Sequence, residues 1–370
     1  MVRDAAGGAV LRAAMVGLSH GHSGTLNPAA PGGLLGTLRQ LPGVQLVAIC
    51  EPEDEAVFAR ERAFAPDLAA YRDVDALLSG TEPDLAIVAL PAVAVPAAAT
   101  RLLGAGTHCL IEKTVARTAA EFEPVVAAAA ASGAHLQIHF PWRFHPAVRQ
   151  MRSLLDEGLL GRPTALAAQM VTSQAGTLPG QRDPARSPYR KETEGGGMLH
   201  YLGGHFLEVI AYLMGEVEAV SAVCAGPVGN LEDDPVMDDV SSVSMRFAGG
   251  AVGTFHTGYL QAVPGPNRDF VQLWGTDGSA YWPGLAGQLA ASSRAAAWAG
   301  APNRSFDFEL KERRGVYGAK EWVFGVARDF VAGIREGRRP EVDGAAALTV
   351  LRLTDAAYEA SRTGRWVTPR

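Results

Sequence analysis

Two side chains in this sequence have the chemistry of an acid–base catalyst, and the first is a lysine. Lys113 follows an apolar run that predicts a buried strand, stands beside Glu112, and is one of only four lysines in the 370 residues. A partly desolvated lysine can hold a substrate hydroxyl, polarise it, or accept a proton once its pKa is lowered. The alternative is a solvated lysine at a strand end that pairs with the adjacent glutamate. Position and rarity together favour a functional role.

The second candidate is His205, at the end of a glycine-rich stretch. Gly195–Gly197 are expected to release the backbone, and the apolar pattern after them predicts a helix of about four turns. In such a helix Tyr201, His205 and Glu208 stand at i, i+4 and i+7 and share one face. A histidine at a helix start, behind flexible glycines, could serve as an acid–base group.

A turn near the N-terminus indicates where a cofactor would bind. Leu11–Val16 is predicted to be a strand, and a glycine-containing turn follows it at once. Small residues in such a turn let backbone N–H groups approach a pyrophosphate, and the next helix start adds a favourable dipole. Ser19 and His22 stand where the second and third glycines of the pattern would be, so an ordinary turn is the alternative. The candidate cofactor-binding residues of this turn are Gly17, Leu18, Ser19, His20, Gly21 and His22.

The segment around this turn has the pattern of a dinucleotide-binding domain. The next predicted strand ends in Glu51, whose carboxylate could accept hydrogen bonds from the adenosine ribose and favour NAD over NADP. A solvated acid at the strand end is the equal alternative. Predicted strands and helices alternate through residue 140, which indicates a parallel sheet with helices on both faces. Ligands of such sheets bind beyond the carboxyl ends of the strands, where Gly17, Glu51, Pro91, Glu112 and Lys113 are all expected.

The pattern changes near residue 141. Short alternating strands separated by glycine turns indicate an α+β domain with an open, mainly antiparallel sheet. We therefore expect a Rossmann domain at 1–140, a substrate and oligomerisation domain at 141–340 and a C-terminal helix at 341–370. The polar segment 173–194 is long for a connection. We take it as part of the substrate mouth, with Arg190 and Lys191 as contacts, and a surface excursion is the equal alternative.

Composition and charge narrow the class of protein. The net charge is −6 without a basic cluster, which argues against nucleic acid as a partner. No apolar run is long enough to span a membrane, and the N-terminus lacks the apolar core of a signal peptide. Cys50, Cys109 and Cys224 are far apart and odd in number, as expected for free thiols in the cytoplasm. No acidic third ligand accompanies the histidine pairs at a recognised spacing, so no metal site is expected.

Taken together, these motifs resemble the glucose–fructose oxidoreductase/inositol dehydrogenase (Gfo/Idh/MocA) family. Glu112-Lys113-Thr114 resembles its Glu-Lys-Pro signature, and the resemblance extends through 143–146 and 195–205 to 357–365. It implies that a sugar, sugar acid or cyclitol hydroxyl lies against the nicotinamide of NAD. The cofactor then carries the hydride while Lys113 and His205 handle the proton. It also implies a last helix that returns to the dinucleotide domain, and a homodimer or homotetramer.

The sequence departs from the family pattern four residues before the histidine, where Tyr201 replaces the usual aspartate. An aspartate would orient the imidazole and raise its pKa, whereas a tyrosine supplies no charge near pH 7. We therefore expect Lys113 to carry more of the acid–base role and Tyr201 to modify it. His200 is turned about 100° from Tyr201 on a helix and cannot replace the aspartate. The candidate substrate contacts are Arg143, His139, Arg190 and His200.

Three functions fit this sequence. The first is an NAD-dependent oxidoreductase that acts on a hydroxyl of a sugar, sugar acid or cyclitol. The second is a lyase or glycoside-cleaving enzyme that recycles its own NAD through a transient keto-sugar. The third is a non-catalytic dinucleotide or sugar sensor, which the missing aspartate favours and the retained Lys113 and His205 disfavour.

Overall fold

The computed structural model describes residues 9–173, 195–226, 238–261, 263 and 265–370. They form two compact units, the first made of Met1–Ala116, Ala120–Pro141 and Leu310–Leu348 and the second of the remaining residues. The expected boundaries put 310–340 with the second domain and all of 341–370 with the first. In the structure Leu310–Leu348, which contains α10, belongs to the first unit, and Thr349–Arg370 belongs to the second.

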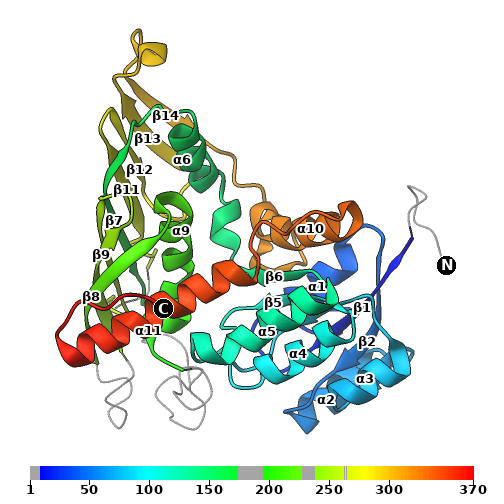
Figure 1. Cartoon of the computed structure of the whole chain (residues 1–370). Coiled ribbons are helices and arrows are strands. Elements are labelled where there is room, and N and C mark those ends of the chain that lie inside the picture. Colours follow the sequence, from blue (N-terminus) through cyan, green and yellow to red (C-terminus); the bar gives the residue numbers. More distant parts are fainter. Residues whose placement is uncertain (1–8, 174–194, 227–237, 262, 264) are drawn as a thin grey trace. The chain divides into compact units, whose positions relative to one another are not determined.

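The first unit is built on a six-stranded parallel sheet in the order β3-β2-β1-β4-β5-β6. The order reverses between β1 and β4, so the crossover helices cover both faces, as Figure 1 shows. This confirms the predicted Rossmann fold. The strands are β1 Leu11–Val16, β2 Val44–Cys50, β3 Ala69–Tyr71, β4 Leu85–Val88, β5 His108–Glu112 and β6 Leu136–His139. The helices are α1 Gly33–Gln40, α2 Glu55–Phe64, α3 Val74–Thr81, α4 Val95–Gly104, α5 Ala119–Ser132 and α10 Glu321–Glu336.

Local chemistry explains where the helices of this unit begin. The side chains of Asp54 and Asp73 accept hydrogen bonds from Val57 N (2.9 Å) and Ala76 N (2.7 Å), so they cap α2 and α3. The central strands β1, β4 and β5 are almost wholly buried, which matches their continuous apolar sequences. The sequence pattern is therefore sufficient to place these elements.

The segment Leu310–Leu348 joins the first unit through close backbone contacts. A Cβ on Gly36 of α1 would lie 1.9 Å from Gly315 O, so glycine is required for this approach. Gln40 donates to Arg314 O at 2.8 Å, and Ile138 N–H donates to Val342 O at 2.8 Å. None of these contacts is local in sequence, which is why the boundary was not readable from composition.

The second unit is built on an eight-stranded sheet in the order β14-β13-β12-β11-β7-β10-β9-β8. Every pairing is antiparallel apart from β7 with β10, which is parallel. The expected hairpin turn at Gly249–Gly250 joins β9 to β10, and Gly250 N–H donates to Phe247 O. Strands β13 and β14 were not anticipated. The strands are β7 Pro163–Val171, β8 Val217–Ala225, β9 Val240–Phe247, β10 Val252–Gly258, β11 Phe270–Gly275, β12 Gly278–Trp282, β13 Gln288–Ser293 and β14 Asn303–Asp307.

One face of this sheet packs against helices and the other is open. Helices α6 (Pro146–Asp156) and α9 (Gly204–Met214) cover the first face through contacts with β12 and β7. Side chains alternate in burial along β9 and β10, as expected for a sheet with one solvated face. The last helix, α11 (Gly344–Thr363), begins in the first unit and continues into the second. No helix in the described part of the chain combines the length and the apolar character needed to cross a membrane.

The buried carboxyl group of Asp269, just before β11, makes the stability of the second unit depend on pH. Burial raises the pKa of Asp269 to about 7, and one of its oxygens accepts Val171 N–H at 3.1 Å. In the unfolded chain an aspartate titrates near ~3.9. The protonated residue therefore contributes stability that is complete below that value and is lost as pH rises toward the folded pKa.

We expect Asp269→Asn to raise the free energy of unfolding at pH 8 by on the order of 2 kcal/mol, with no gain near pH 4. Urea denaturation at the two pH values measures this. The control is Asp277→Asn, because Asp277 is half-buried and its hydrogen bond with Arg294 lowers its pKa, so that variant should gain nothing at pH 8. Equal stability of Asp269→Asn and the parent at pH 8 would contradict the assignment.

Candidate cofactor and active site

The turn after β1 is shaped by one glycine. Gly17 has φ +88°, and a Cβ at this position would lie 2.1 Å from Ala89 O, so no other residue fits. Its N–H donates to Cys50 O at 2.8 Å, and its carbonyl accepts Ser23 Oγ–H at 2.8 Å. The turn is thereby fixed at the carboxyl ends of β1, β2 and β4. By contrast, a Cβ on Gly21 would meet nothing within 4 Å.

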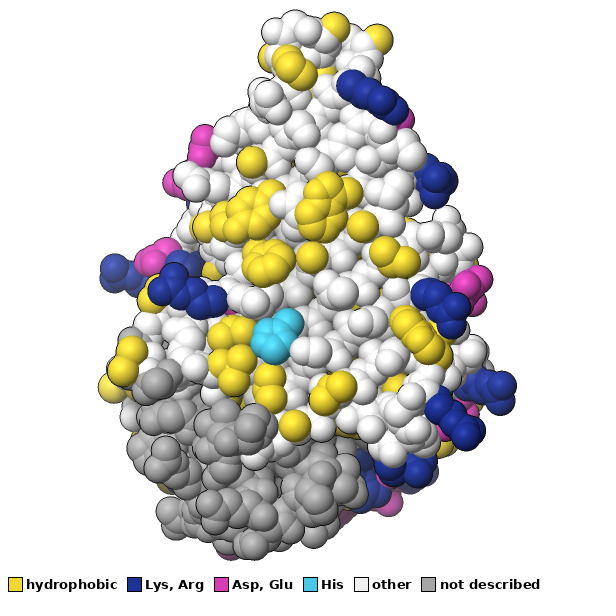
Figure 2. All heavy atoms as spheres, turned by 90° about the vertical axis from the view of Figure 1, so that its left-hand side faces the viewer, with side chains coloured by type: hydrophobic (Ala, Val, Ile, Leu, Met, Phe, Trp, Pro, Cys, Tyr) yellow, Lys and Arg dark blue, Asp and Glu magenta, His cyan; other side chains and the backbone are white. Residues whose placement is uncertain are grey.

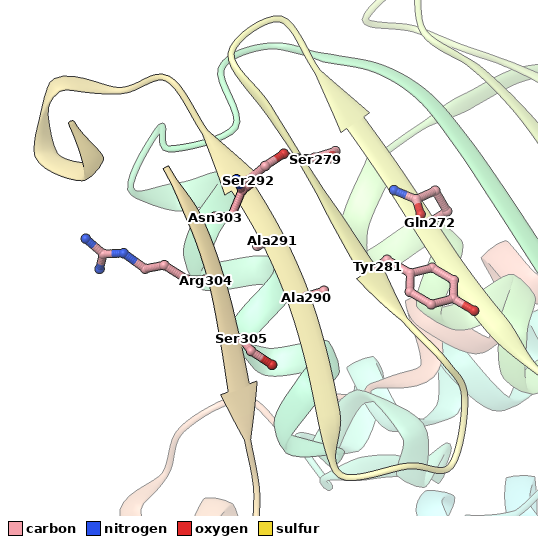
Figure 3. Close-up of a pocket in the computed structure, with 9 residues that line it drawn as sticks. All are labelled: Gln272, Ser279, Tyr281, Ala290, Ala291, Ser292, Asn303, Arg304 and Ser305. Carbon is pink, nitrogen blue, oxygen red and sulfur yellow. Dashed lines mark hydrogen bonds between the residues drawn. The ribbon is translucent and has the colours of Figure 1, made fainter. Parts of the chain in front are cut away.

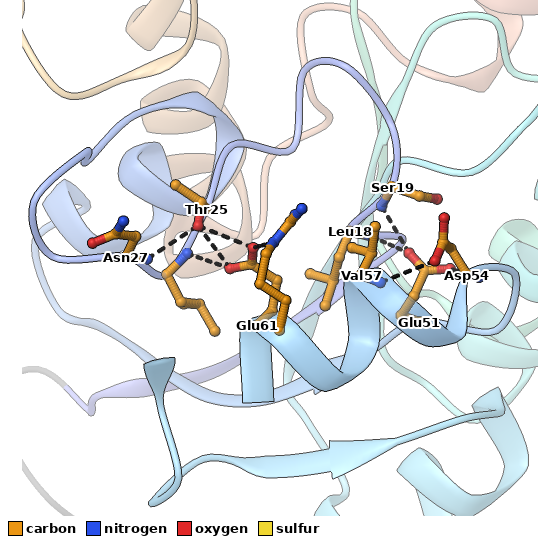
Figure 4. Close-up of polar contacts among 10 residues, drawn as sticks. Leu18, Ser19, Thr25, Asn27, Glu51, Asp54, Val57 and Glu61 are labelled. Carbon is orange, nitrogen blue, oxygen red and sulfur yellow. Dashed lines mark hydrogen bonds and ion pairs between the residues drawn. The ribbon is translucent and has the colours of Figure 1, made fainter. Parts of the chain in front are cut away.

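Glu51 is fully buried, and its carboxylate holds this turn (Figure 4). One oxygen accepts Leu18 N–H (2.5 Å) and Ser19 N–H (2.8 Å). The other oxygen accepts the N–H groups of Glu53 (2.7 Å) and Asp54 (3.1 Å). A carboxylate has about four acceptor sites, so all of them are in use. Glu51 can therefore accept a hydrogen bond from a ribose hydroxyl only if one of these backbone hydrogen bonds breaks. Because Glu51 is buried, the alternative that it is a solvated acid is wrong.

A second buried glutamate, which sequence reasoning missed, anchors the loop that follows. Glu61 of α2 is fully buried and accepts Leu26 N–H at 2.6 Å and Thr25 Oγ–H at 2.9 Å and 3.0 Å (Figure 4). Its spacing of three from the buried Phe58 puts it on the inner face of the helix. An acid on that face was the available signal. The inserted loop before α1 is thus held to α2.

The buried carboxylate of Glu112 joins three segments at the same edge of the sheet. Its oxygens lie 3.0 Å from His22 Nδ1 and 3.1 Å from His139 Nδ1. Tyr317, which was not anticipated, has its hydroxyl 3.2 Å from His22 Nε2 and its ring 5.3 Å from that of His139. Burial works to raise the pKa of Glu112, but His139 and His22 outweigh it and hold that pKa well below its usual value.

Lys113 follows Glu112 and is 2% exposed, so the expected desolvation is present. His20 lies beside His22, with ring centroids 4.9 Å apart. Burial lowers the pKa of His20 to about 4; Glu112 opposes this, while His22 and Lys113 add to it. His20 is therefore neutral near pH 7, and Lys113 is within electrostatic range of His20. Pro91, also at this edge, accepts the N–H groups of Ala94 and Val95 and so begins α4.

The three glycines before His205 serve close packing within the second unit. A Cβ on Gly195, Gly196 or Gly197 would lie within 2.6 Å of an atom of Arg117, Tyr358 or Asp238, respectively. The expectation of a flexible hinge is therefore replaced by a crowded backbone. Their sequence gives no sign of these partners.

Asp238, which was also missed, fixes the start of the helix that carries His205. It is 2% exposed, and its carboxylate accepts Leu199 N–H (2.9 Å), Ser241 Oγ–H (2.7 Å) and Tyr358 Oη–H (2.7 Å). Its carbonyl accepts Met198 N–H at 2.8 Å. These bonds replace the side-chain cap that the glycines cannot supply.

The predicted helix begins with a π-helical turn, Leu199–Gly203, before α9. Such a turn holds an extra residue and is frequent at functional sites, so the i, i+4 relation of Tyr201 to His205 is not that of a regular α-helix. Tyr201 is half-buried, whereas His205 and Glu208 are buried. The ring of Trp142 lies 6.1 Å from that of His205.

The candidate substrate residues are placed differently from one another. Arg143 donates to Glu208 through Nε (2.7 Å) and Nη2, and lies over the ring of Tyr212 at 4.5 Å. Burial raises the pKa of Glu208, and Arg143 opposes that shift. Arg143 is thus engaged within its own unit. His200 is buried, with its Cβ 2.9 Å from the position that a Gly196 Cβ would take. Arg190 and Lys191 lie outside the described residues.

Within the described ranges, no group of three histidine, cysteine or acidic side chains is arranged to hold a metal ion.

Comparison with known proteins identifies both units. A family model described as an oxidoreductase family with an NAD-binding Rossmann fold matches residues 11–140, and the GFO/IDH/MocA C-terminal domain model matches 148–281. D-apiose dehydrogenase of Paraburkholderia graminis is 24% identical over 89% of this chain and 84% of its own length. Levoglucosan dehydrogenase of Pseudarthrobacter phenanthrenivorans is 25% identical over 65% and 64%. A structure of levoglucosan dehydrogenase with NADH and levoglucosan superposes with a TM-score of 0.81 at 20% identity, covering 97% of this chain and 99% of that one.

The four hydrogen bonds to Glu51 yield a prediction for the turn after β1. In Glu51→Gln an NH₂ group faces one pair of backbone N–H donors, which leaves them without an acceptor. We expect the free energy of unfolding to fall by about 2 kcal/mol and NADH to bind roughly tenfold more weakly. Chemical denaturation and a fluorescence titration with NADH measure the two effects. Glu53→Gln is the control, because its exposed side chain leaves the backbone donor in place. If both variants match the parent, the carboxylate does not shape the turn.

Proposed function

The chain belongs to the Gfo/Idh/MocA family of NAD-binding oxidoreductases, and on that premise we propose that it transfers a hydride between NAD and a hydroxyl-bearing carbon of a sugar, sugar acid or cyclitol. The names of its relatives, D-apiose dehydrogenase and levoglucosan dehydrogenase, support this substrate class. The observation that carries the proposal is Lys113, buried at the end of β5, at the sheet edge where the Gly17 turn follows β1.

The first unit fits the cofactor. Gly17 brings the turn against the ends of β2 and β4, and no side chain occupies the space beside Gly21. We propose that Gly17, Leu18, Ser19, His20, Gly21 and His22 hold the pyrophosphate side of NAD. Glu51 underlies this turn, and its negative charge disfavours the 2′-phosphate of NADP. When bound, NAD supplies the hydride chemistry.

Lys113 is the proposed acid–base residue for the substrate hydroxyl. In the direction of oxidation its amine takes the hydroxyl proton while the C–H hydride leaves. In the direction of reduction, Lys113 returns the proton to the oxygen while the hydride returns to the carbon. Burial disfavours the charged ammonium, which suits a group that must accept a proton. We propose His205 as a second group, but Tyr201 gives it no charged partner, so its contribution is the smaller one.

We also propose that two copies of the chain associate through the open face of the eight-stranded sheet. Figure 2 shows hydrophobic side chains gathered on this face, and the exposed residues that alternate onto it include Val252, Trp274 and Tyr281. A hollow of about 450 Å³ lies on the same face over β11–β14, with Gln272, Ser279 and Tyr281 among its lining (Figure 3). Contiguous apolar surface of this kind marks an interface.

The three unpaired cysteines fit a reducing cytoplasm, where we place the protein.

The oligomer proposal predicts the effect of a charge on this face. Trp274→Glu should convert a dimer or tetramer into a smaller species without changing the thermal midpoint of the monomer core, since the side chain is 41% exposed. Light scattering after size-exclusion chromatography gives the mass. Leu285→Glu, at an exposed loop position of similar exposure (46%), is the control. A parent chain that is already monomeric would refute the proposal.

The catalytic proposal predicts that Lys113→Ala lowers kcat by roughly 10²–10⁴-fold while the affinity for NADH stays within about twofold. D-Apiose and levoglucosan are the first substrates to test, with NADH formation as the signal. Lys320→Ala is the control, because Lys320 is an exposed lysine paired with Glu312. Full turnover in Lys113→Ala would overturn the assignment. Product formed without added NAD, and without net NADH, would instead identify the NAD-recycling lyase or glycoside-cleaving reaction.

A further inference from the structure

The arrangement around Glu112 is more than a set of cofactor contacts, because one buried carboxylate lies between two imidazoles. His22 Nδ1 forms a hydrogen bond with one oxygen at 3.0 Å, and His139 Nδ1 lies 3.1 Å from the other without hydrogen-bond alignment, so that contact is electrostatic. The last residues of β5 and β6, Glu112 and His139, are register partners in the sheet, so this contact is fixed by the backbone. His22 comes from the turn after β1 and closes the other side.

The charge of this cluster makes it a proton acceptor. With both imidazoles neutral it carries one buried negative charge, which is unfavourable in a medium of low dielectric. When one imidazole is protonated the net charge becomes zero, and the carboxylate is paired with a cation at hydrogen-bond distance. A single proton can therefore be shared among the three groups without creating net charge. The carboxylate side chain is 1% exposed, which keeps water from competing.

We propose that His22, Glu112 and His139 form one proton-holding site, which takes the substrate proton from Lys113 and releases it to solvent at His22. This inference rests on the proposed function of Lys113. It assigns the three residues a joint role in proton transfer, in addition to the cofactor contact proposed for His22.

The proton balance of the step is simple. Oxidation leaves Lys113 as an ammonium and the cluster with a charge of −1. One proton then passes to an imidazole nitrogen, so that Lys113 returns to its amine and the cluster becomes neutral. Release of that proton to water or buffer restores the starting charge. No electron pair other than those of the N–H bonds is involved, and no further reactant is needed.

The side-chain exposure of the three groups indicates where a proton would leave the site. The side chain of His139 is 2% exposed and that of His22 is 25% exposed, so solvent reaches the cluster at His22. The hydroxyl of Tyr317 at 3.2 Å from Nε2 orients the His22 ring and extends the chain of polar groups. The titratable groups that face the cluster from the turn, β5, β6 and the 310–348 segment are His20, His22, Glu112, Lys113, His139 and Tyr317.

Histidine NMR tests the site without any substrate. In protein labelled with ¹⁵N-histidine, we expect His22 and His139, assigned with His22→Gln and His139→Gln, to carry Nδ1–H in the neutral form. We expect the protonation of one to move the signals of the other. In Glu112→Gln, where the carboxylate between them is lost, the protonation of one histidine should leave the signals of the other unchanged. Two independent titrations in the parent protein, unaffected by each other, would overturn the proposal even if Glu112→Gln failed to fold.

Turnover provides the second test, with the substrate that responds to Lys113→Ala. His139→Gln should lower kcat by about 10-fold or more, leave KM and the NADH affinity within about twofold, and recover with added imidazole in proportion to its concentration. His256→Gln, in the other unit and bonded to Ser242, should match the parent at every imidazole concentration. A loss in His139→Gln that imidazole does not change would contradict a proton-transfer role. Loss of activity in Lys113→Ala together with full activity in His139→Gln would refute the relay and leave the proposed function standing.

Discussion

A carboxylate taken out of water must be paired or it opposes folding by roughly several kcal/mol, and this chain buries many of them. Glu51, Glu61 and Glu112 in the first unit are each 2% exposed or less. Each contacts groups from a different segment of the chain: Glu51 accepts from backbone amides of a turn, Glu61 from a loop threonine, and Glu112 lies beside two histidines. Because a buried carboxylate without partners is costly, these acids constrain where the turn after β1 and its loop can lie.

The same constraint operates in the second unit with different donors. The carboxylate of Asp238 accepts hydrogen bonds from Leu199, Ser241 and Tyr358. The three glycines allow the backbone before the helix to pack closely enough for these bonds to form. Glu208 is paired with Arg143 in the same unit. The result is that the helix with His205 is held at its start by Asp238 and, beyond His205, by the ion pair of Glu208 with Arg143. A rigid support of this kind suits a functional side chain better than a hinge would.

The spacing of apolar residues along the sequence predicts the helices and strands, but it does not predict the contacts between them. β1, β2, β5 and the β9–β10 hairpin follow from apolar runs and glycine turns, and the strand ends located Gly17 and Lys113 correctly at one edge. The engagement of Glu51 by four amides could not be read, because its donors stand 32 and 33 residues away and also two and three residues after it. Tyr317 lies 295 residues from His22 in the chain. The π-helical turn was missed because its apolar sequence is equally suited to an α-helix.

The late return of Leu310–Leu348 has a consequence for the order in which the protein forms. The ribosome delivers the whole parallel sheet well before the residues that complete it, since Tyr317, Val342 and α10 follow the Trp142–Glu309 part of the second unit. During that interval the His22 side of the turn and the outer edge of β6 lack their covering segment. Long-range closure of this type slows folding and leaves edges exposed to other chains. Nascent chains of this protein therefore complete their cofactor-binding half only after most of the second unit has been synthesised, although that half is encoded first.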